Sequence, residues 1–127
     1  MNEYSFEQFN ATGGRIIPYI SLGESGGFGV SAGLVKKYEI GSVVAVKVFY
    51  DKAKNAVAFK FSDKFEDGML KVKMAPKQGG GHISAKVFLV KYDIDANKFK
   101  GKYTPREIEM PNVGKVFVID LKENSTL

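Results

Sequence analysis

The chain contains one short pattern twice, and this repetition limits what it can fold into. Residues 30–40 and residues 83–94 each read as an apolar residue, a serine, a short helical stretch, and then an aromatic residue, an acidic residue and an isoleucine. Strand-like sequence follows each copy. A unit of roughly 40 residues cannot bury its own apolar face alone, so the two copies are expected to pack together. The repeat predicts a pseudo-symmetric pair of units.

Length and composition are typical of one globular domain. The chain has 127 residues, of which 44% are hydrophobic, and this is enough for a single core. It has no run of about 18 apolar residues, so we expect no membrane span. The first residues have neither a basic cap nor an apolar stretch, so we expect no secretory signal. The absence of cysteine excludes disulfides and thiolate chemistry and favours a cytoplasmic protein.

The patterns of apolar residues predict a β-rich α+β fold. Residues 43–50 are almost continuously apolar, which is typical of a strand covered on both faces. Turn residues separate them from a second strand over 56–61, so we expect a β-hairpin. Two further strands are predicted, one at 69–74 with Lys71 and Lys73 on the same side, and one at 115–121.

Each copy of the repeat predicts one short helix. Ser31 has the position of an N-cap for a helix that ends near Tyr38. Leu34 lies four residues before Tyr38, so both side chains are expected to face the core. Ser84 is predicted to cap the second helix, in which an aromatic pair with the same spacing faces inward.

We expect the whole chain, 1–127, to form a single domain. A proline within the apolar stretch 15–20 indicates that this first strand lies at a sheet edge, because proline cannot donate a ladder hydrogen bond. The expected order is an N-terminal arm with this edge strand at 1–27, a first unit at about 28–66, a connecting strand and loop at 67–80, and a second unit at about 81–122.

With its elements in this order, the repeat unit resembles the AbrB/MraZ swapped-hairpin family of DNA-binding domains. Val30 and Ser31 occupy the position of the family's Ile-Pro pair. Lys36 and Lys37 match its paired basic residues, and residues 38–40 match its Leu-Gly-Ile step before the hairpin. In this family two units interlock into one small barrel, either as a dimer or within one chain. The resemblance therefore implies a barrel-like core and a DNA-binding function, for example as a transcriptional regulator.

The distribution of charge also points to an anionic partner. The formal net charge is +5, but residues 71–106 contain nine basic residues against only Asp93 and Asp95. These residues around the second copy therefore carry more net positive charge than the chain as a whole. This concentration favours nucleic acid as the partner. Lysine outnumbers arginine, which favours attraction to phosphates over bidentate reading of bases. The alternative is a lysine-rich surface that serves only solubility.

The residues expected to contact phosphates fall into two groups. Lysines of the two short helices form the first, and a strand over 98–103 carries the second as a stripe along one face, because alternate side chains of a strand point the same way. The candidate nucleic-acid-binding residues are Lys36, Lys37, Lys86, Lys91, Lys98, Lys100, Lys102 and Arg106.

We expect no catalysis, metal or cofactor. His82 is the single histidine, and it has no nearby cysteine, acid cluster or activated serine in the sequence, so we interpret it as structural. The glycines before it lack the Gly-Lys-Ser/Thr ending of a phosphate-binding loop and are interpreted as a linker.

Two other function classes remain open. Exposed strand edges would suit an interaction or scaffold protein that pairs with itself as a homo-oligomer or with a partner. Strands that contact bases directly would suit a binder of single-stranded DNA. In a strand over 98–103, however, Phe99 and Tyr103 would lie on the face opposite the lysines, which favours a role in the core.

Overall fold

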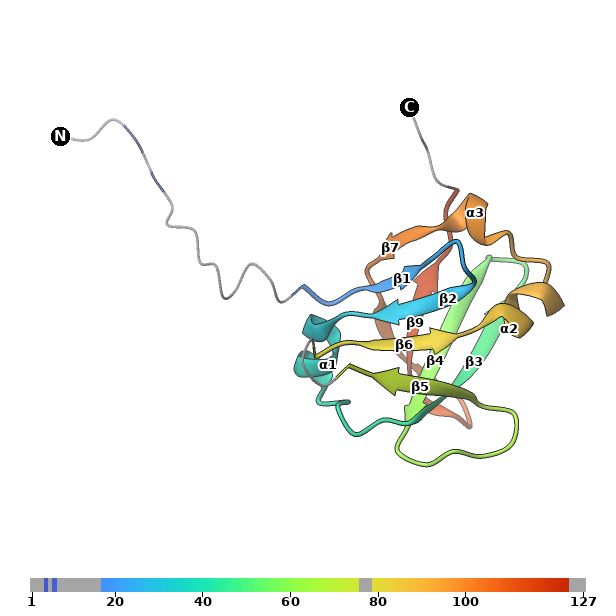
Figure 1. Cartoon of the computed structure of the whole chain (residues 1–127), viewed down its shortest axis with the longest axis horizontal. Coiled ribbons are helices and arrows are strands. Elements are labelled where there is room, and N and C mark those ends of the chain that lie inside the picture. The colour runs from blue at the N-terminus through green and yellow to red at the C-terminus, as the bar shows by residue number, and fades with distance from the viewer. Residues whose placement is uncertain (1–3, 5, 7–16, 76–78, 124–127) are drawn as a thin grey trace.

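The computed structural model describes residues 4, 6, 17–75 and 79–123. Within these residues nine strands form one curled antiparallel sheet, in the order β7-β1-β2-β6-β5-β3-β4-β9-β8 (Figure 1). The structure confirms the predicted fold class, which is β-rich α+β. The strands are β1 (Ile20–Leu22), β2 (Gly27–Val30), β3 (Ala45–Asp51), β4 (Ala56–Ser62), β5 (Leu70–Met74), β6 (Gly81–Ser84), β7 (Gly101–Tyr103), β8 (Arg106–Met110) and β9 (Gly114–Asp120), and the helices are α1 (Ala32–Tyr38), α2 (Lys86–Lys91) and α3 (Ala96–Phe99).

The curled sheet forms two layers that enclose the core. Strands β1, β2, β6 and β5 cross the front of the molecule in Figure 1, and β4 and β9 lie behind them. A short pairing of β3 with β5, at Ala45 opposite Lys71, joins the two layers. Phe28 of the front layer and Phe59 of the back layer are fully buried, and their rings meet edge to face with centroids 5.0 Å apart. This contact between aromatic rings lies at the centre of the core.

The pairing of β2 with β6 forms the middle of the front layer. The two strands are antiparallel, with Phe28 opposite Ile83 and Gly29 opposite His82. Strand β2 continues into α1 and β6 continues into α2. Because the strands run in opposite directions, the two helices leave the sheet at opposite ends, as Figure 1 shows. The basic side chains of the two helices are therefore far apart.

The two helices end in the same local geometry. Glu39 after α1 and Asp93 after α2 both adopt the left-handed conformation, with φ of 53° and 55°. The amide of the next residue, Ile40 or Ile94, then donates a hydrogen bond to the carbonyl five residues earlier, at 3.1 and 2.8 Å. This is the Schellman type of helix end. The acid and the isoleucine of the repeat therefore occupy equivalent positions at the two helix ends.

The starts of the two helices differ, which corrects one prediction. Ser31 caps α1 as predicted, since its Oγ accepts a hydrogen bond from the Leu34 amide at 3.1 Å. Ser84 does not cap α2, which has Ala85 at its N-cap and no side-chain capping bond. The reason is that β6 pairs with strands on both sides and Ser84 lies opposite Gly27, so the chain stays extended through Ser84.

The predicted strand over 98–103 is also wrong in its first half. Residues 96–99 form helix α3, because the Asp95 side chain accepts hydrogen bonds from the amides of Asn97 and Lys98 and so caps a helical turn. Only 101–103 pair as strand β7. The basic residues of this segment therefore do not form one strand-borne stripe.

The position of the first strand is a further correction. Part of the predicted strand over 15–20, and most of the predicted arm, lie outside the described residues. The observed strand β1 begins at Ile20, after Pro18, and lies between β7 and β2 instead of at an edge. Strand β8, which the sequence patterns did not indicate, occupies an edge of the sheet. In the predicted loop before His82, residues 76–78 are outside the described part.

Replacing Ser31 by alanine is expected to destabilise the fold far more than the same change at Ser84. The Ser31 hydroxyl is buried, accepts from the amides of Tyr19 and Leu34, and donates to the Ile17 carbonyl. Its loss should lower the free energy of unfolding by about 2 kcal/mol. Ser84→Ala should change it by less than about 0.5 kcal/mol. Denaturation in urea measures both, and equal losses would contradict the assignment of the cap.

Candidate functional site

The outer face of the front layer carries a row of polar residues across five strands. Alternation along each strand directs Ile20, Phe28 and Ile83 into the core and their neighbours to the outside. The register then aligns the outward residues directly opposite one another, in the order Lys102 (β7), Ser21 (β1), Gly29 (β2), His82 (β6) and Lys73 (β5). Four steps of about 4.8 Å make this row about 19 Å long.

Two glycines of β2 make room on this face for side chains of the neighbouring strands. A Cβ on Gly29 would lie 2.5 Å from the Oγ of Ser21, and a Cβ on Gly27 would lie 2.5 Å from the Nε2 of His82. The side chains of Ser21 and His82 therefore lie over the bare backbone of β2. A hollow of about 410 Å³ opens here, lined by both side chains together with Tyr19 and Lys73.

The charged groups around the hollow are cationic. Lys102 and Lys73 lie at the two ends of the row, and Lys71 is exposed on the same side of β5 as Lys73. The Nζ of Lys102 lies 4.7 Å from the centroid of the Tyr19 ring. Among the residues that the structure describes, no carboxylate lines the hollow, and the ion pairs involve other lysines and Arg106. We call the outward-facing Ser21, Gly29, Lys71, Lys73, His82 and Lys102 the cationic face.

Three of the eight predicted site residues are paired with carboxylates instead. Lys98 forms an ion pair with Glu123 at 2.9 Å, and Lys100 forms one with Glu24. Arg106 donates from one nitrogen to both carboxylate oxygens of Asp120, at 2.9 and 3.2 Å. The hydrogen bond and charge of Glu123 raise the pKa of Lys98 above its ordinary value. Nearby negative charge therefore offsets the charge of these three side chains.

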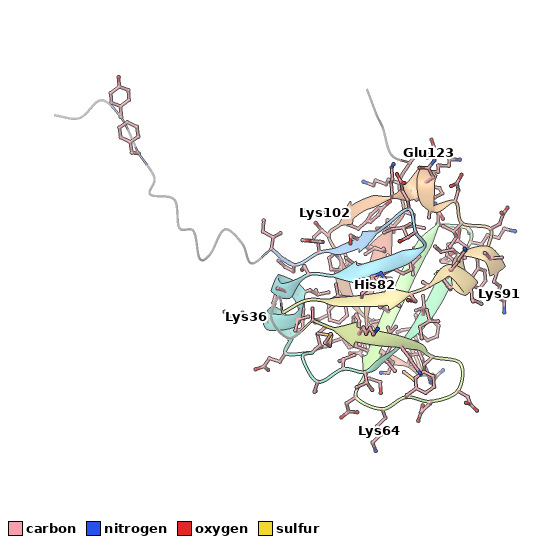
Figure 2. All side chains as sticks on the ribbon, in the orientation of Figure 1. Lys36, Lys64, His82, Lys91, Lys102 and Glu123 are labelled. Atoms are coloured by element: carbon pink, nitrogen blue, oxygen red, sulfur yellow. The ribbon has the colours of Figure 1, made fainter. Side chains whose placement is uncertain are left out.

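The other predicted residues do not converge on one surface. Lys36 and Lys37 are exposed on α1, and Lys86 and Lys91 are exposed on α2. Figure 2 shows Lys36 and Lys91 at opposite ends of the front layer, with His82 between them. Of the eight, only Lys102 belongs to the cationic face.

His82 and the lysines of β5 are the residues that sequence reasoning did not select. Lys71 and Lys73 were placed correctly on one side of a strand, and the structure confirms this. His82 was interpreted as structural because no partner lay near it in the sequence. The available signal was the alternate glycines of Gly27–Val30, which are typical of a strand whose backbone is approached closely.

Other kinds of site find little support in the part of the chain that the structure describes. It contains no group of three or more histidine, cysteine, aspartate or glutamate side chains that could hold a metal ion. None of its helices is long and apolar enough to cross a membrane. A second hollow of about 330 Å³ lies on the back layer, over Ala56 and Ala58 and beside Ile108.

No protein-family description, curated protein or solved structure matches this chain.

Removing the Glu123 carboxylate is expected to lower the pKa of Lys98. In Glu123→Gln the hydrogen bond from Lys98 to a charged oxygen is lost, so its pKa should fall towards the ordinary value for lysine. A pH titration of the Lys98 side-chain NMR signals measures this shift. The control Glu24→Gln, which removes the partner of Lys100, should leave the Lys98 titration unchanged. An identical titration in all three proteins would disprove the pair.

Proposed function

We propose that this chain is a non-enzymatic nucleic-acid-binding protein that contacts phosphates through the cationic face. The observation that carries the proposal is the row from Lys102 to Lys73, which passes a hollow floored by Gly29 that no described carboxylate lines. Lysines that neutralise phosphates release the counterions condensed on a nucleic acid, and this release drives binding. A cytoplasmic protein, for example a transcriptional regulator, would be consistent with this activity.

The lysines of the two helices extend the positive field beyond the row. Lys36 and Lys37 lie at one end of the front layer, and Lys86 and Lys91 lie at the other. An elongated anion that crosses the cationic face would pass near one or both groups. These lysines are therefore retained as secondary phosphate contacts, and they are expected to act mainly through long-range attraction. Lys98, Lys100 and Arg106 contribute less, because each already has a carboxylate partner.

We also propose that the fold is built from two related units. The copies in the sequence are offset by 53 residues, which makes Gly29 and His82 equivalent positions. These two residues lie opposite each other at the centre of the β2–β6 pairing. From that centre the sheet continues on one side to β1 and β7, and on the other to β5 and β3. If β5, which precedes β6 as β1 precedes β2, is counted with the second unit, then β3 of the first unit pairs with the second. Such interlocking is what the resemblance to AbrB/MraZ swapped hairpins implies.

A second candidate function is protein interaction through the back layer. Strand β8 lies at an edge of the sheet, and Ile108 on it is 42% exposed. Next to it lies a hollow with an apolar floor at Ala56 and Ala58 and a rim that includes the charged residues Asp51, Lys54, Arg106 and Asp120. An edge strand beside an apolar surface is suited to pairing with a partner or with a second copy of the chain.

The proposal is tested by removing both lysines at the ends of the row. Lys73→Gln with Lys102→Gln should weaken binding to a labelled oligonucleotide by about tenfold at low salt, since two phosphate contacts are lost. The slope of log affinity against log salt should become shallower by about 1.4 to 1.8. Fluorescence anisotropy over a salt series measures both quantities.

The matched control is Lys52→Gln with Lys54→Gln. It removes the same charge from exposed lysines in the turn between β3 and β4, on the other layer. Binding should fall much less in this variant. An equal fall in both variants would place the interface elsewhere, and absence of binding by the unaltered protein at low salt would disprove the proposed function.

A further inference from the structure

We infer that the cationic face binds a single nucleic-acid strand, with Tyr19 as a stacking platform for a base, and that it does not accept a duplex. This inference rests on the proposed function and names the class of nucleic acid.

The width of the face excludes insertion into a duplex groove. The row from Lys102 to Lys73 crosses five paired strands and is about 19 Å long. The major groove of B-DNA is about 12 Å wide and admits a helix or a two-stranded ribbon. A five-stranded face therefore cannot enter it. Helices α1 and α2 are narrow enough, but they lie at opposite ends of the front layer, and only the start of α1, at Ala32, reaches the hollow.

The shape of the hollow fits a thin, flexible chain. Its floor is the backbone of β2 at Gly29, and its walls include Ser21 and His82. A volume of about 410 Å³ is at the lower end of the range for small-molecule pockets, so part of one nucleotide can enter. In a rigid duplex the bases are paired and stacked inside the helix, so none of them can enter the hollow. A single strand can bend into it.

The groups around the hollow match the parts of a nucleotide. Tyr19 lines it, and the Nζ of Lys102 lies over one face of the Tyr19 ring, 4.7 Å from its centroid. A base would stack on the other face of the ring or replace Lys102 on this one, and Lys102 would then meet the phosphate of that base. The Ser21 hydroxyl and the His82 ring supply hydrogen-bond donors beside the floor. Lys73 lies at the other end of the row to meet a second phosphate. Cations and an aromatic platform in one groove are the combination used for single strands without sequence preference.

The glycines of β2 provide independent support. Gly29 does not have a positive φ, so its backbone conformation does not require glycine. Glycine weakens a strand interior and often marks a place where another group approaches the backbone closely. At Gly29 the Oγ of Ser21 lies 2.5 Å from the position that a Cβ would take, and the hollow adjoins both residues. A side chain at this position would push Ser21 towards the hollow and narrow it.

The first experiment compares strands directly. The full chain is titrated into a labelled oligothymidylate of about 16 nucleotides and into a duplex of the same length. We expect affinity for the single strand to be at least about tenfold higher at low salt. Equal affinity, or preference for the duplex, would overturn this inference and leave the proposed function in place. Binding to neither probe would overturn both.

The second experiment fills the hollow without changing charge. Gly29→Ala adds a methyl group at the floor, where Ser21 must move, and should weaken single-strand binding about fivefold or more. Gly23→Ala is the matched control, because its added Cβ would have no neighbour closer than 3.9 Å and it lies outside the lining of the hollow. Thermal melting of both variants checks that they are folded. Equal affinity of the two folded variants would contradict the inference.

Substitution of Tyr19 provides a further test, which can be used even if Gly29→Ala does not fold. Tyr19→Leu should weaken single-strand binding by about tenfold, because stacking of one base is lost, while Tyr19→Phe should retain it. If Tyr19 had only a structural role, Tyr19→Leu would lower the melting temperature. At a temperature where both variants are folded, Tyr19→Leu and Tyr19→Phe would then bind the single strand equally well. Unchanged affinity in folded Tyr19→Leu would overturn the assignment of the stacking platform.

Discussion

The antiparallel pairing of β2 with β6 is the interaction on which the rest of the structure depends. It joins the β1–β2 and β5–β6 hairpins, which are distant in sequence, into one continuous layer. On the inner side it brings Phe28 against Ile83, and both side chains are fully buried. On the outer side the same register brings Gly29 against His82. One set of backbone hydrogen bonds therefore positions both the centre of the core and the centre of the cationic face.

This arrangement links the burial of the core to the choice of side chains that lie on the surface. The side chains of a strand alternate between two faces, so a shift of one residue would exchange them. Such a slip in β6 would expose Ile83 and bury His82 in an apolar core. Burial of Phe28, Ile83 and Phe59 thus selects the register, and the register decides which polar groups are exposed. Because β2 contributes two glycines outward, the side chains of Ser21 and His82 can lie over its backbone.

Local patterns in the sequence predicted those elements whose formation depends on near neighbours. The hairpin of β3 and β4, the Ser31-capped helix and the last strand were all expected close to their observed bounds. The failures have specific causes. Ser84 resembles Ser31 in sequence, but pairing of β6 on both sides holds it in a strand. The alternation after Asp95 resembles a strand, but the Asp95 carboxylate caps a helical turn instead.

The sequence by itself determined that this is a β-rich, cysteine-free chain with its excess positive charge concentrated between residues 71 and 106. Composition and alternation are properties of the chain alone, so they could be read without coordinates. Which lysines have a carboxylate partner depends on the tertiary structure. Glu24 reaches Lys100 across 76 residues of sequence, while Lys73 and Lys102 meet no carboxylate among the described ion pairs. Whether a lysine is paired with a carboxylate, and whether several lysines lie on one surface, depends on distances of a few ångströms. The register of strands that are remote in sequence sets these distances.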